Sequence, residues 1–147
     1  MKDFKNKVAV ITGAASGLGR AFADKASSLK MKIVLGDIRV APLQQAAAEL
    51  KSQGAEVVAL AGDVSKADYI EALARLATDS FGVAHCLFNN AGVGSGGLVW
   101  ENSVRDWEWV LGVNLWGVIH GIRSFVPRML AAAKKDASYA GHIVNTS

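Results

Sequence analysis

The chain of 147 residues is long enough for one domain with its own hydrophobic core, or for part of a larger one. Apolar types make up 51% and charged types 20%, a balance that excludes a disordered chain and a coiled coil. The net charge of +3 is scattered along the sequence, without the basic arm that is typical of nucleic-acid binding.

Two further features bear on location and partners. The single cysteine, Cys86, cannot form an internal disulfide, and the sequence before Lys7 lacks the apolar core of a secretory signal. No apolar stretch reaches the roughly 18 residues that a membrane span needs. We therefore expect a cytoplasmic protein that binds neither nucleic acid nor a membrane.

Short apolar runs alternate with helical patterns along the chain. The first run, from Lys7 to Thr12, is rich in β-branched residues and stops at Gly13, which is typical of a strand buried on both faces. The expected strands are 7–12, 33–35, 57–61, 86–88 and 143–144. Apolar positions between them recur at helical spacing, and the expected helices are approximately 18–29, 42–53, 65–79 and 103–134.

Three of these helices carry local signals. Pro42 suits a first helical position. Ser65 and Asp68 have the spacing of a capping box, with Asp in place of the usual Glu. Pro127 is expected to kink the last helix or to end its first part, because proline has no N–H for the helical hydrogen bond.

The alternation of five strands with four helices predicts the fold. Near-continuous apolar strands indicate a parallel sheet covered on both faces, and right-handed crossovers then give a doubly wound, Rossmann-like α/β fold in three layers. The fifth apolar run stops at Ser147, at the end of a core strand rather than in a polar linker. We therefore expect residues 1–147 to form a dinucleotide-binding domain that is incomplete at its C-terminal end.

A glycine-rich turn joins the first strand to the first helix. It runs Thr12-Gly13-Ala14-Ala15-Ser16-Gly17-Leu18-Gly19, and the free N–H groups at the helix start suit a phosphate. Gly13 permits a sharp turn, Gly17 permits close approach of the backbone to a pyrophosphate, and Gly19 lets the helix pack against the sheet. The spacing differs from the common Gly-x-Gly-x2-Gly pattern, so a turn without a ligand is the alternative.

An acidic residue follows at the end of the second strand. Asp37 lies 18 residues after Gly19, near the roughly 20-residue offset at which a carboxylate meets the ribose hydroxyls of NAD. The same carboxylate would repel the 2′-phosphate of NADP, so NAD is the favoured cofactor. Arg39 points the other way, since a nearby arginine accommodates NADP. The alternative for Asp37 is a solvated side chain in a turn.

The histidine and tryptophan residues do not point to a functional site. His85, His120 and His142 have no carboxylate or cysteine at metal-ligand spacing, so no metal site is predicted. Trp109 and Trp116 share a helical face, which predicts a core or a subunit interface rather than a stacking platform.

Taken together, these residues resemble the short-chain dehydrogenase/reductase family, and the resemblance covers residues 7–147. The family motif Thr-Gly-x3-Gly-x-Gly is matched from Thr12 to Gly19, Asp63-Val64 resembles a pair beside the adenine, and Asn89-Asn90-Ala91-Gly92 resembles the motif that borders the cofactor. The positions that this resemblance assigns to the cofactor are Thr12, Gly13, Ala15, Ser16, Gly17, Leu18, Gly19, Asp37, Ile38, Arg39, Asp63, Val64, Asn90, Ala91, Gly92 and Val113.

The resemblance also implies a set of catalytic residues. Asn114 sits where the family places its active-site asparagine. The catalytic serine would fall one residue beyond Ser147, or on Ser147 itself if the register slips by one. Neither Tyr69 nor Tyr139 is followed by lysine four residues on, so the family's Tyr-x3-Lys pair is not found in this sequence.

What the resemblance implies is an oxidoreductase that moves hydride between NAD(H) and a small alcohol or carbonyl substrate, working as a homodimer or homotetramer. Residues 1–147 would hold its cofactor-binding part and would by themselves be inactive. The alternative is a dinucleotide-binding module or partner subunit without chemistry of its own, because a fold alone does not establish an activity.

Overall fold

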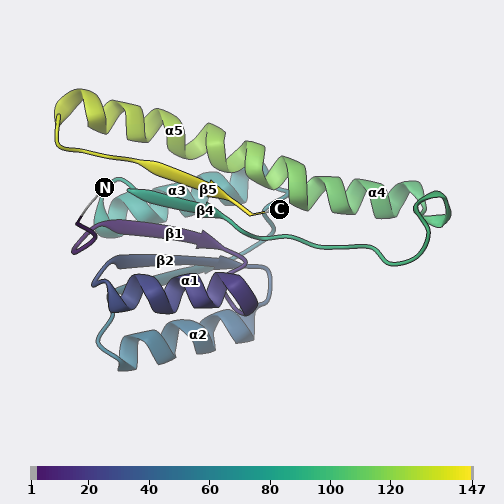
Figure 1. Cartoon of the computed structure of the whole chain (residues 1–147), viewed down its shortest axis with the longest axis horizontal. Helices are drawn as coiled ribbons and strands as arrows, with labels where there is room; N and C mark the ends of the chain where they lie inside the picture. The colour runs from purple at the N-terminus through teal and green to yellow at the C-terminus, as the bar shows by residue number, and fades with distance from the viewer. Residues whose placement is uncertain (1–2, 147) are drawn as a thin grey trace.

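The computed structural model describes residues 3–146 and shows a parallel five-stranded sheet between helices (Figure 1). The strand order is β3-β2-β1-β4-β5, and every neighbouring pair is parallel. The strands are β1 (Val8–Thr12), β2 (Lys32–Asp37), β3 (Val57–Ala61), β4 (Cys86–Asn89) and β5 (His142–Asn145). The predicted doubly wound, Rossmann-like α/β fold is confirmed, and the strand order reverses between β1 and β4.

Helices cover both faces of this sheet. They are α1 (Gly17–Ser28), α2 (Val40–Ser52), α3 (Ala67–Phe81), α4 (Val104–Leu111) and α5 (Gly117–Lys135). Figure 1 shows α1 and α2 on one face, and α3 with α5 on the other. Helix α4 continues the line of α5 beyond the sheet, and it has no buried residue. Among the described helices, none is long and apolar enough to cross a membrane.

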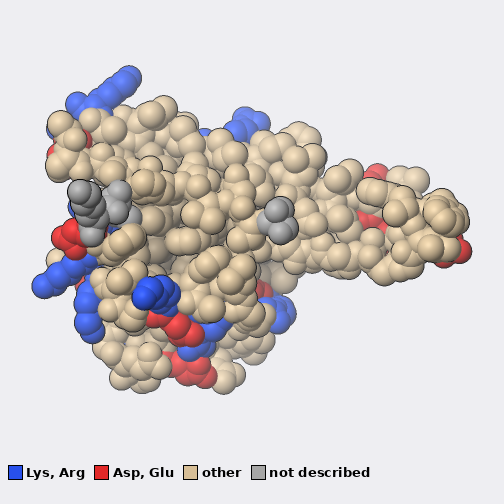
Figure 2. Space-filling view, in the orientation of Figure 1, with Lys and Arg blue, Asp and Glu red and all other residues tan. Residues whose placement is uncertain are grey.

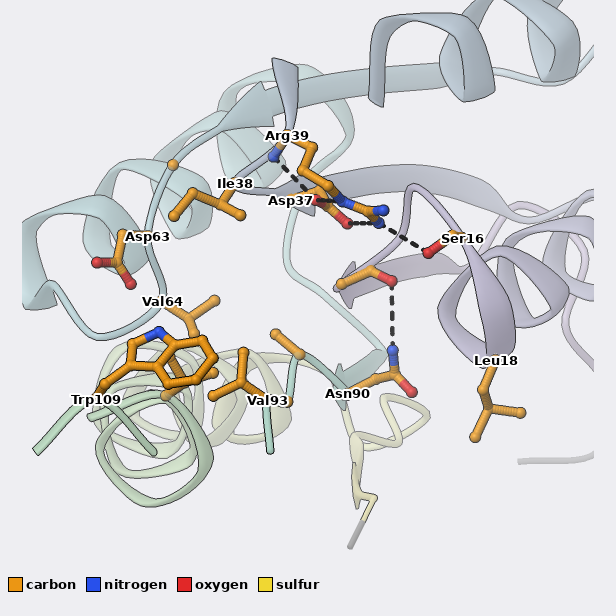
Figure 3. Close-up of a pocket in the computed structure, with 15 residues that line it drawn as sticks. Ser16, Leu18, Asp37, Ile38, Arg39, Asp63, Val64, Asn90, Val93 and Trp109 are labelled. Atoms are coloured by element: carbon orange, nitrogen blue, oxygen red, sulfur yellow. Dashed lines mark hydrogen bonds and ion pairs between the residues drawn. The ribbon is translucent and has the colours of Figure 1, made fainter. Parts of the chain in front are cut away.

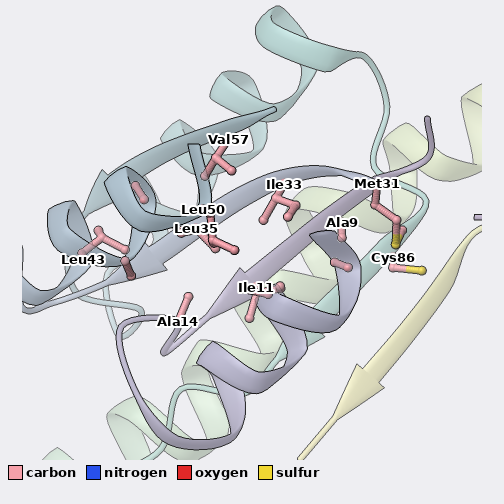
Figure 4. Close-up of a cluster of buried hydrophobic side chains, with 14 residues drawn as sticks. Ala9, Ile11, Ala14, Met31, Ile33, Leu35, Leu43, Leu50, Val57 and Cys86 are labelled. Atoms are coloured by element: carbon pink, nitrogen blue, oxygen red, sulfur yellow. The ribbon is translucent and has the colours of Figure 1, made fainter. Parts of the chain in front are cut away.

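The core forms two layers because alternate side chains of a strand point to opposite faces. Ile11 and Leu35 pack with Leu43 and Leu50 of α2 on the α1/α2 side (Figure 4). A second cluster on the α3/α5 side combines Val10 and Val34 with Leu73, Leu87 and Phe125. Every residue of β1 is buried, as expected for a strand at the centre of a covered parallel sheet.

The two edge strands depart from the expected burial on both faces. In β3 only the first residue is buried, and in β5 three of four residues are exposed. An edge strand has a neighbouring strand on one side only. Among the described residues, β3 and β5 are therefore less covered than β1 at the centre of the sheet.

Two of the predicted helix starts are wrong in detail. Helix α3 begins at Ala67 after Lys66, and Ser65 and Asp68 form no capping box. The Asp63 carboxylate instead accepts the Ser65 N–H at 2.9 Å, which holds Ser65 in a turn ahead of the helix. Pro42 is the third residue of α2 rather than the first, a position that still needs no helical N–H.

The predicted helix 103–134 is divided, but not at Pro127. A π-helical segment, Gly112–Trp116, separates α4 from α5, and α5 continues past Pro127 to Lys135. Pro127 is exposed, and so is Arg123, the residue whose carbonyl it leaves without a helical partner. A Cβ on Gly121 would lie 2.2 Å from Asn89 Oδ1, so α5 approaches β4 more closely than any side chain at that position would allow.

Candidate functional site

A cavity of about 610 Å³ lies at the carboxyl ends of β1, β2, β3 and β4, and we call it the strand-end cavity (Figure 3). It lies beside the reversal of strand order, where doubly wound folds bind their ligands. The predicted cofactor residues that line it are Gly13, Ser16, Leu18, Asp37, Ile38, Arg39, Asp63, Val64, Asn90, Ala91, Gly92 and Val113. The fold therefore brings together segments that are distant in the sequence.

The three glycines of the first turn differ in their surroundings. A Cβ on Gly13 would lie 2.9 Å from Ala91 Cα, and one on Gly19 would lie 2.2 Å from the Gly13 carbonyl oxygen. Gly17 has a positive φ of 55°, and a Cβ placed on it would have no described atom within 4 Å. Packing explains the first two glycines, whereas Gly17 borders open space at the start of α1.

The start of α1 carries no side-chain cap among the described residues. Ser16 is the N-cap residue, but its hydroxyl makes no capping bond and instead accepts a hydrogen bond from Arg39 Nη2 at 2.8 Å. The first N–H groups of an α-helix have no partner within the helix, and the helix dipole adds partial positive charge there. This end of α1 is therefore suited to an anion.

Asp37 is buried at the end of β2, and its carboxylate is ionised. Oδ2 accepts the N–H of Ala15 at 3.0 Å, and Oδ1 accepts the N–H of Arg39 at 3.0 Å. Burial acts to raise the pKa of Asp37, but hydrogen bonds from the Arg39 side chain and from these two N–H groups outweigh it and hold the pKa below its usual value. A negative charge is thus fixed in one orientation at the cavity wall.

Thr12 supports the cavity from below. Its buried hydroxyl oxygen accepts the N–H groups of Asn90 at 3.0 Å and Ala91 at 3.1 Å, and it donates to the Phe88 carbonyl at 3.2 Å. The Asn90 amide in turn donates to the Thr12 carbonyl at 3.0 Å. Thr12 therefore positions the turn after β4 against the glycine turn, and it does not itself line the cavity.

Asn114 lies in the π-helical segment and is bonded to Val93 through both ends of its amide. Nδ2 donates to the Val93 carbonyl at 2.8 Å, and Oδ1 accepts the Val93 N–H at 2.9 Å. This pair of bonds holds the chain after Gly92 against the helix, and π segments are frequent at functional sites. Ser147, the other predicted catalytic residue, lies outside the described residues.

Neither tyrosine lines the strand-end cavity. The Tyr69 hydroxyl donates to the Leu60 carbonyl at 2.8 Å, and the Tyr139 hydroxyl donates to the Ala84 carbonyl. Burial raises the pKa of both, that of Tyr139 to about 12. Within residues 3–146, therefore, no tyrosine is placed at the cavity to exchange a proton. The same residues contain no cluster of His, Cys, Asp or Glu that could hold a metal ion.

The lining of the strand-end cavity overlaps the predicted cofactor residues but does not coincide with them. Ala15, Gly17 and Gly19 belong to the turn but do not line the cavity, whereas Gly62 and Val93 do. Both missed residues adjoin predicted motifs at strand ends, a signal that could have found them. Trp109 is half exposed and also lines the cavity, so of the two predicted alternatives the core is wrong, and a subunit interface stays a prediction. Helix α4 extends beyond the sheet, so the sheet cannot bury it.

The fold and the strand-end cavity define an α/β protein of the doubly wound class, with a cavity at the place where such folds bind their ligands. A family model described as short chain dehydrogenase matches residues 7–147. The chain belongs to the short-chain dehydrogenase family.

Similar proteins agree with this assignment. The C alpha-dehydrogenase of Sphingobium sp. is 40% identical over 151 residues, which cover 100% of this chain and 47% of the relative. The CLA biosynthesis dehydrogenase/reductase of Lactiplantibacillus plantarum is 37% identical over 130 residues, 88% of this chain and 46% of the relative. The chain thus spans about half the length of these curated relatives.

Solved structures give the same picture. A short chain dehydrogenase/reductase from Burkholderia phymatum, in complex with NAD, superposes with a TM-score of 0.94 at 52% identity, covering 100% of this chain and 50% of that one. The 3-ketoacyl-(acyl-carrier-protein) reductase of Brucella melitensis, complexed with NADH, has a TM-score of 0.85 at 30% identity, with 90% and 54% coverage.

Proposed function

We propose that this chain binds NAD(H) as the cofactor-binding part of an oxidoreductase that moves hydride between the nicotinamide and an alcohol or carbonyl substrate. The observation that carries the proposal is the uncapped start of α1, where Ser16 and Leu18 line the strand-end cavity together with the fixed Asp37 carboxylate. Together these features offer donors for a pyrophosphate and acceptors for a ribose.

The residues present fit such a dinucleotide. N–H groups at the start of α1 would hold the pyrophosphate, Asp37 the adenosine ribose, and Asp63 with Val64 the adenine. Asn90, Ala91 and Gly92 would border the remainder, held in place by Thr12. The bound nicotinamide supplies or accepts the hydride, which no side chain of the protein can do.

We further propose a preference for NAD over NADP. The ionised Asp37 repels a 2′-phosphate, and Ser16 adds no charge to oppose that repulsion. The test is calorimetric titration of the protein with each dinucleotide. NAD should bind more tightly, and Asp37→Ala should narrow the difference by removing the repulsion. Equal affinities in the unchanged protein would refute the preference.

Within residues 3–146, the catalytic part of the proposal rests on Asn114 alone. The family's chemistry implies a tyrosine as general acid/base, and Tyr69 and Tyr139 are both bound to backbone carbonyls away from the cavity. We infer that a polypeptide ending at Ser147 binds dinucleotide without turnover. NADH absorbance, followed with a panel of small ketones, tests this inference, and steady oxidation by the 147-residue polypeptide would contradict it.

The second candidate is a dinucleotide-binding module or partner subunit without its own chemistry. It is favoured by the tyrosines of residues 3–146, both of which donate to backbone carbonyls away from the strand-end cavity. The coding sequence after Ser147 distinguishes the two candidates. A serine followed about a dozen residues later by Tyr-x3-Lys supports the enzyme, and a stop codon supports the module.

Assembly and location are proposals as well. We propose a homodimer or homotetramer, supported by exposed apolar side chains on the helices α4 and α5 and the segment between them, among them Leu111, Trp116 and Leu130. Sedimentation equilibrium tests it, and a monomer at micromolar concentration would contradict it. A cytoplasmic location is proposed because Cys86 is a free thiol.

A further inference from the structure

The Asp37 carboxylate accepts four hydrogen bonds, two at each oxygen. The backbone supplies one donor to each: the Arg39 N–H to Oδ1 and the Ala15 N–H to Oδ2. The Arg39 guanidinium supplies the other two, from Nε to Oδ1 at 3.1 Å and from Nη2 to Oδ2 at 3.3 Å. A carboxylate has about four lone-pair sites, so those of Asp37 are filled.

The two kinds of donor differ in how firmly the fold holds them. The backbone donors belong to the glycine turn and to the short turn between β2 and α2, whereas the Arg39 side chain is half exposed. In Figure 3 the guanidinium lies beside the carboxylate and reaches Ser16, whose hydroxyl accepts a hydrogen bond from Nη2 at 2.8 Å. The side-chain donors can therefore leave while the backbone donors keep the carboxylate oriented.

A ribose diol presents two O–H donors to a carboxylate, one to each oxygen, as the guanidinium does here. We propose that the Arg39 side chain occupies the ribose position of the strand-end cavity, and that the diol of NAD displaces it. This inference rests on the proposed dinucleotide site. It makes Arg39 an internal competitor of NAD.

The same residue acts in the opposite sense toward NADP. Arg39 is the single cationic side chain among the described residues that line the cavity, which also include the carboxylates of Asp37 and Asp63. A displaced guanidinium near Ser16 can pair with a 2′-phosphate, a charge-assisted contact that arginine makes well. Arg39 therefore weakens NAD binding and strengthens NADP binding, so it reduces the selectivity that Asp37 creates.

The test is calorimetric titration of the unchanged protein and of Arg39→Ala with NAD and with NADP. We expect the variant to bind NAD about two- to fivefold more tightly, because the half-exposed Arg39 side chain no longer competes for the Asp37 carboxylate. We expect it to bind NADP about tenfold more weakly, because a charged hydrogen bond is lost. Arg39→Gln, which keeps a long side chain but removes the charge, should change both affinities in the same directions.

Arg75→Ala is the matched control. Arg75 is an exposed residue of α3 that does not line the cavity, and its loss changes the net charge equally. It should leave both affinities unchanged. The inference is overturned if Arg39→Ala weakens NAD binding or leaves both affinities as they were. If the unchanged protein binds neither dinucleotide, the proposed function fails instead.

A spectroscopic readout tests the displacement itself. The Arg39 Nε–H resonance, assigned by its loss in Arg39→Ala, should shift and exchange faster with water when NAD is added, because its bond to Asp37 is broken. A resonance that does not move while NAD binds would show that the guanidinium keeps its place, and would overturn the inference.

Discussion

Two helices of this protein follow a serine, and they begin in opposite ways. At the start of α4, Ser103 Oγ accepts the Asp106 N–H at 3.3 Å, while the Asp106 carboxylate accepts the Ser103 N–H at 2.9 Å. At the start of α1, Ser16 makes no such bond and faces Arg39 instead. In α4 the capping box supplies hydrogen-bond acceptors from residues at the helix start itself. In α1 the first N–H groups have no such acceptor and remain available for another group.

The surroundings of the two helix starts differ as well. Helix α1 buries Gly19, Ala23 and Ala26 against the sheet, so the fold fixes its start beside β1 and β2. Helix α4 has no buried residue. It forms part of the arm that extends to the right in Figure 2, and the surface of this arm shows few charged side chains. The packed helix offers its N–H groups in a fixed place, and the projecting helix needs a cap to hold its first turn.

The largest effect is expected from Gly19→Val, which disrupts the packing that fixes the start of α1. A Cβ there would lie 2.2 Å from the Gly13 carbonyl oxygen and 2.6 Å from Asn90 Nδ2. Overpacking against backbone should cost about 3 kcal/mol of unfolding free energy and remove NADH binding. Urea unfolding and fluorescence titration measure the two effects. Gly94→Val is the control, since nothing described lies within 4 Å of its Cβ.

Gly17→Val should separate backbone strain from loss of the site. Gly17 and Gly54 both have positive φ, 55° and 86°, and open space around a Cβ, but Gly54 lies after α2 and away from the cavity. Valine at either position should cost about 1–2 kcal/mol of stability. Gly17→Val alone should weaken NADH binding, by at least about tenfold. Similar affinities in both variants would mean that the space beside Gly17 is not the phosphate position.

The two serines provide the sharpest form of the comparison. Ser103→Ala should cost the first turn of α4 about 1 kcal/mol, because the Asp106 N–H loses the hydroxyl oxygen that accepts its hydrogen bond. Amide hydrogen exchange in residues 104–111 should then be about fivefold faster. Ser16→Ala should leave exchange in α1 unchanged, because no capping bond is lost. Faster exchange in α1 after Ser16→Ala would show that the helix start is capped after all.

The smallest effect concerns the opposite end of the sheet, at His85. Its Nδ1 accepts the Val8 N–H at 3.2 Å, and burial, helped by the charge of Lys7, lowers the pKa of the ring. The neutral ring therefore stabilises the fold above its usual pKa of about 6.5, and this contribution is lost as the pH falls through the lowered value. Unfolding free energies at pH 7.5 and 5.5 should differ less in His85→Phe than in the unchanged protein. An equal difference in both would contradict this account.

Much of the fold could be predicted because buried strands have a local sequence pattern. The apolar run from Val57 to Ala61 matched β3 without error. The positions of Gly13 and Asp37 at the strand-end cavity followed from the rule that ligands bind at the carboxyl ends of parallel strands. Burial of the edge strands could not be predicted, since it depends on the order of strands and not on their composition.

Contacts between distant residues, and one local competition, account for the remaining errors. Asp63 accepts the Ser65 N–H and so prevents the expected capping box at α3, a competition that spacing does not reveal. The projection of α4 brings Trp109 to the cavity rather than to the core. The contact of Arg39 with Ser16 joins two turns 23 positions apart, which a reading of either turn alone does not show.

The central claim is that the uncapped start of α1 binds the pyrophosphate of a nicotinamide dinucleotide. Its most direct test is an NMR titration of the 15N-labelled protein with NADH, following the amide N–H signals of Gly17, Leu18 and Gly19. These signals should shift in a saturable manner, while those of Val104 and Arg105 at the capped start of α4 stay in place. Saturable NADH binding that leaves the three α1 amides unmoved would contradict the claim.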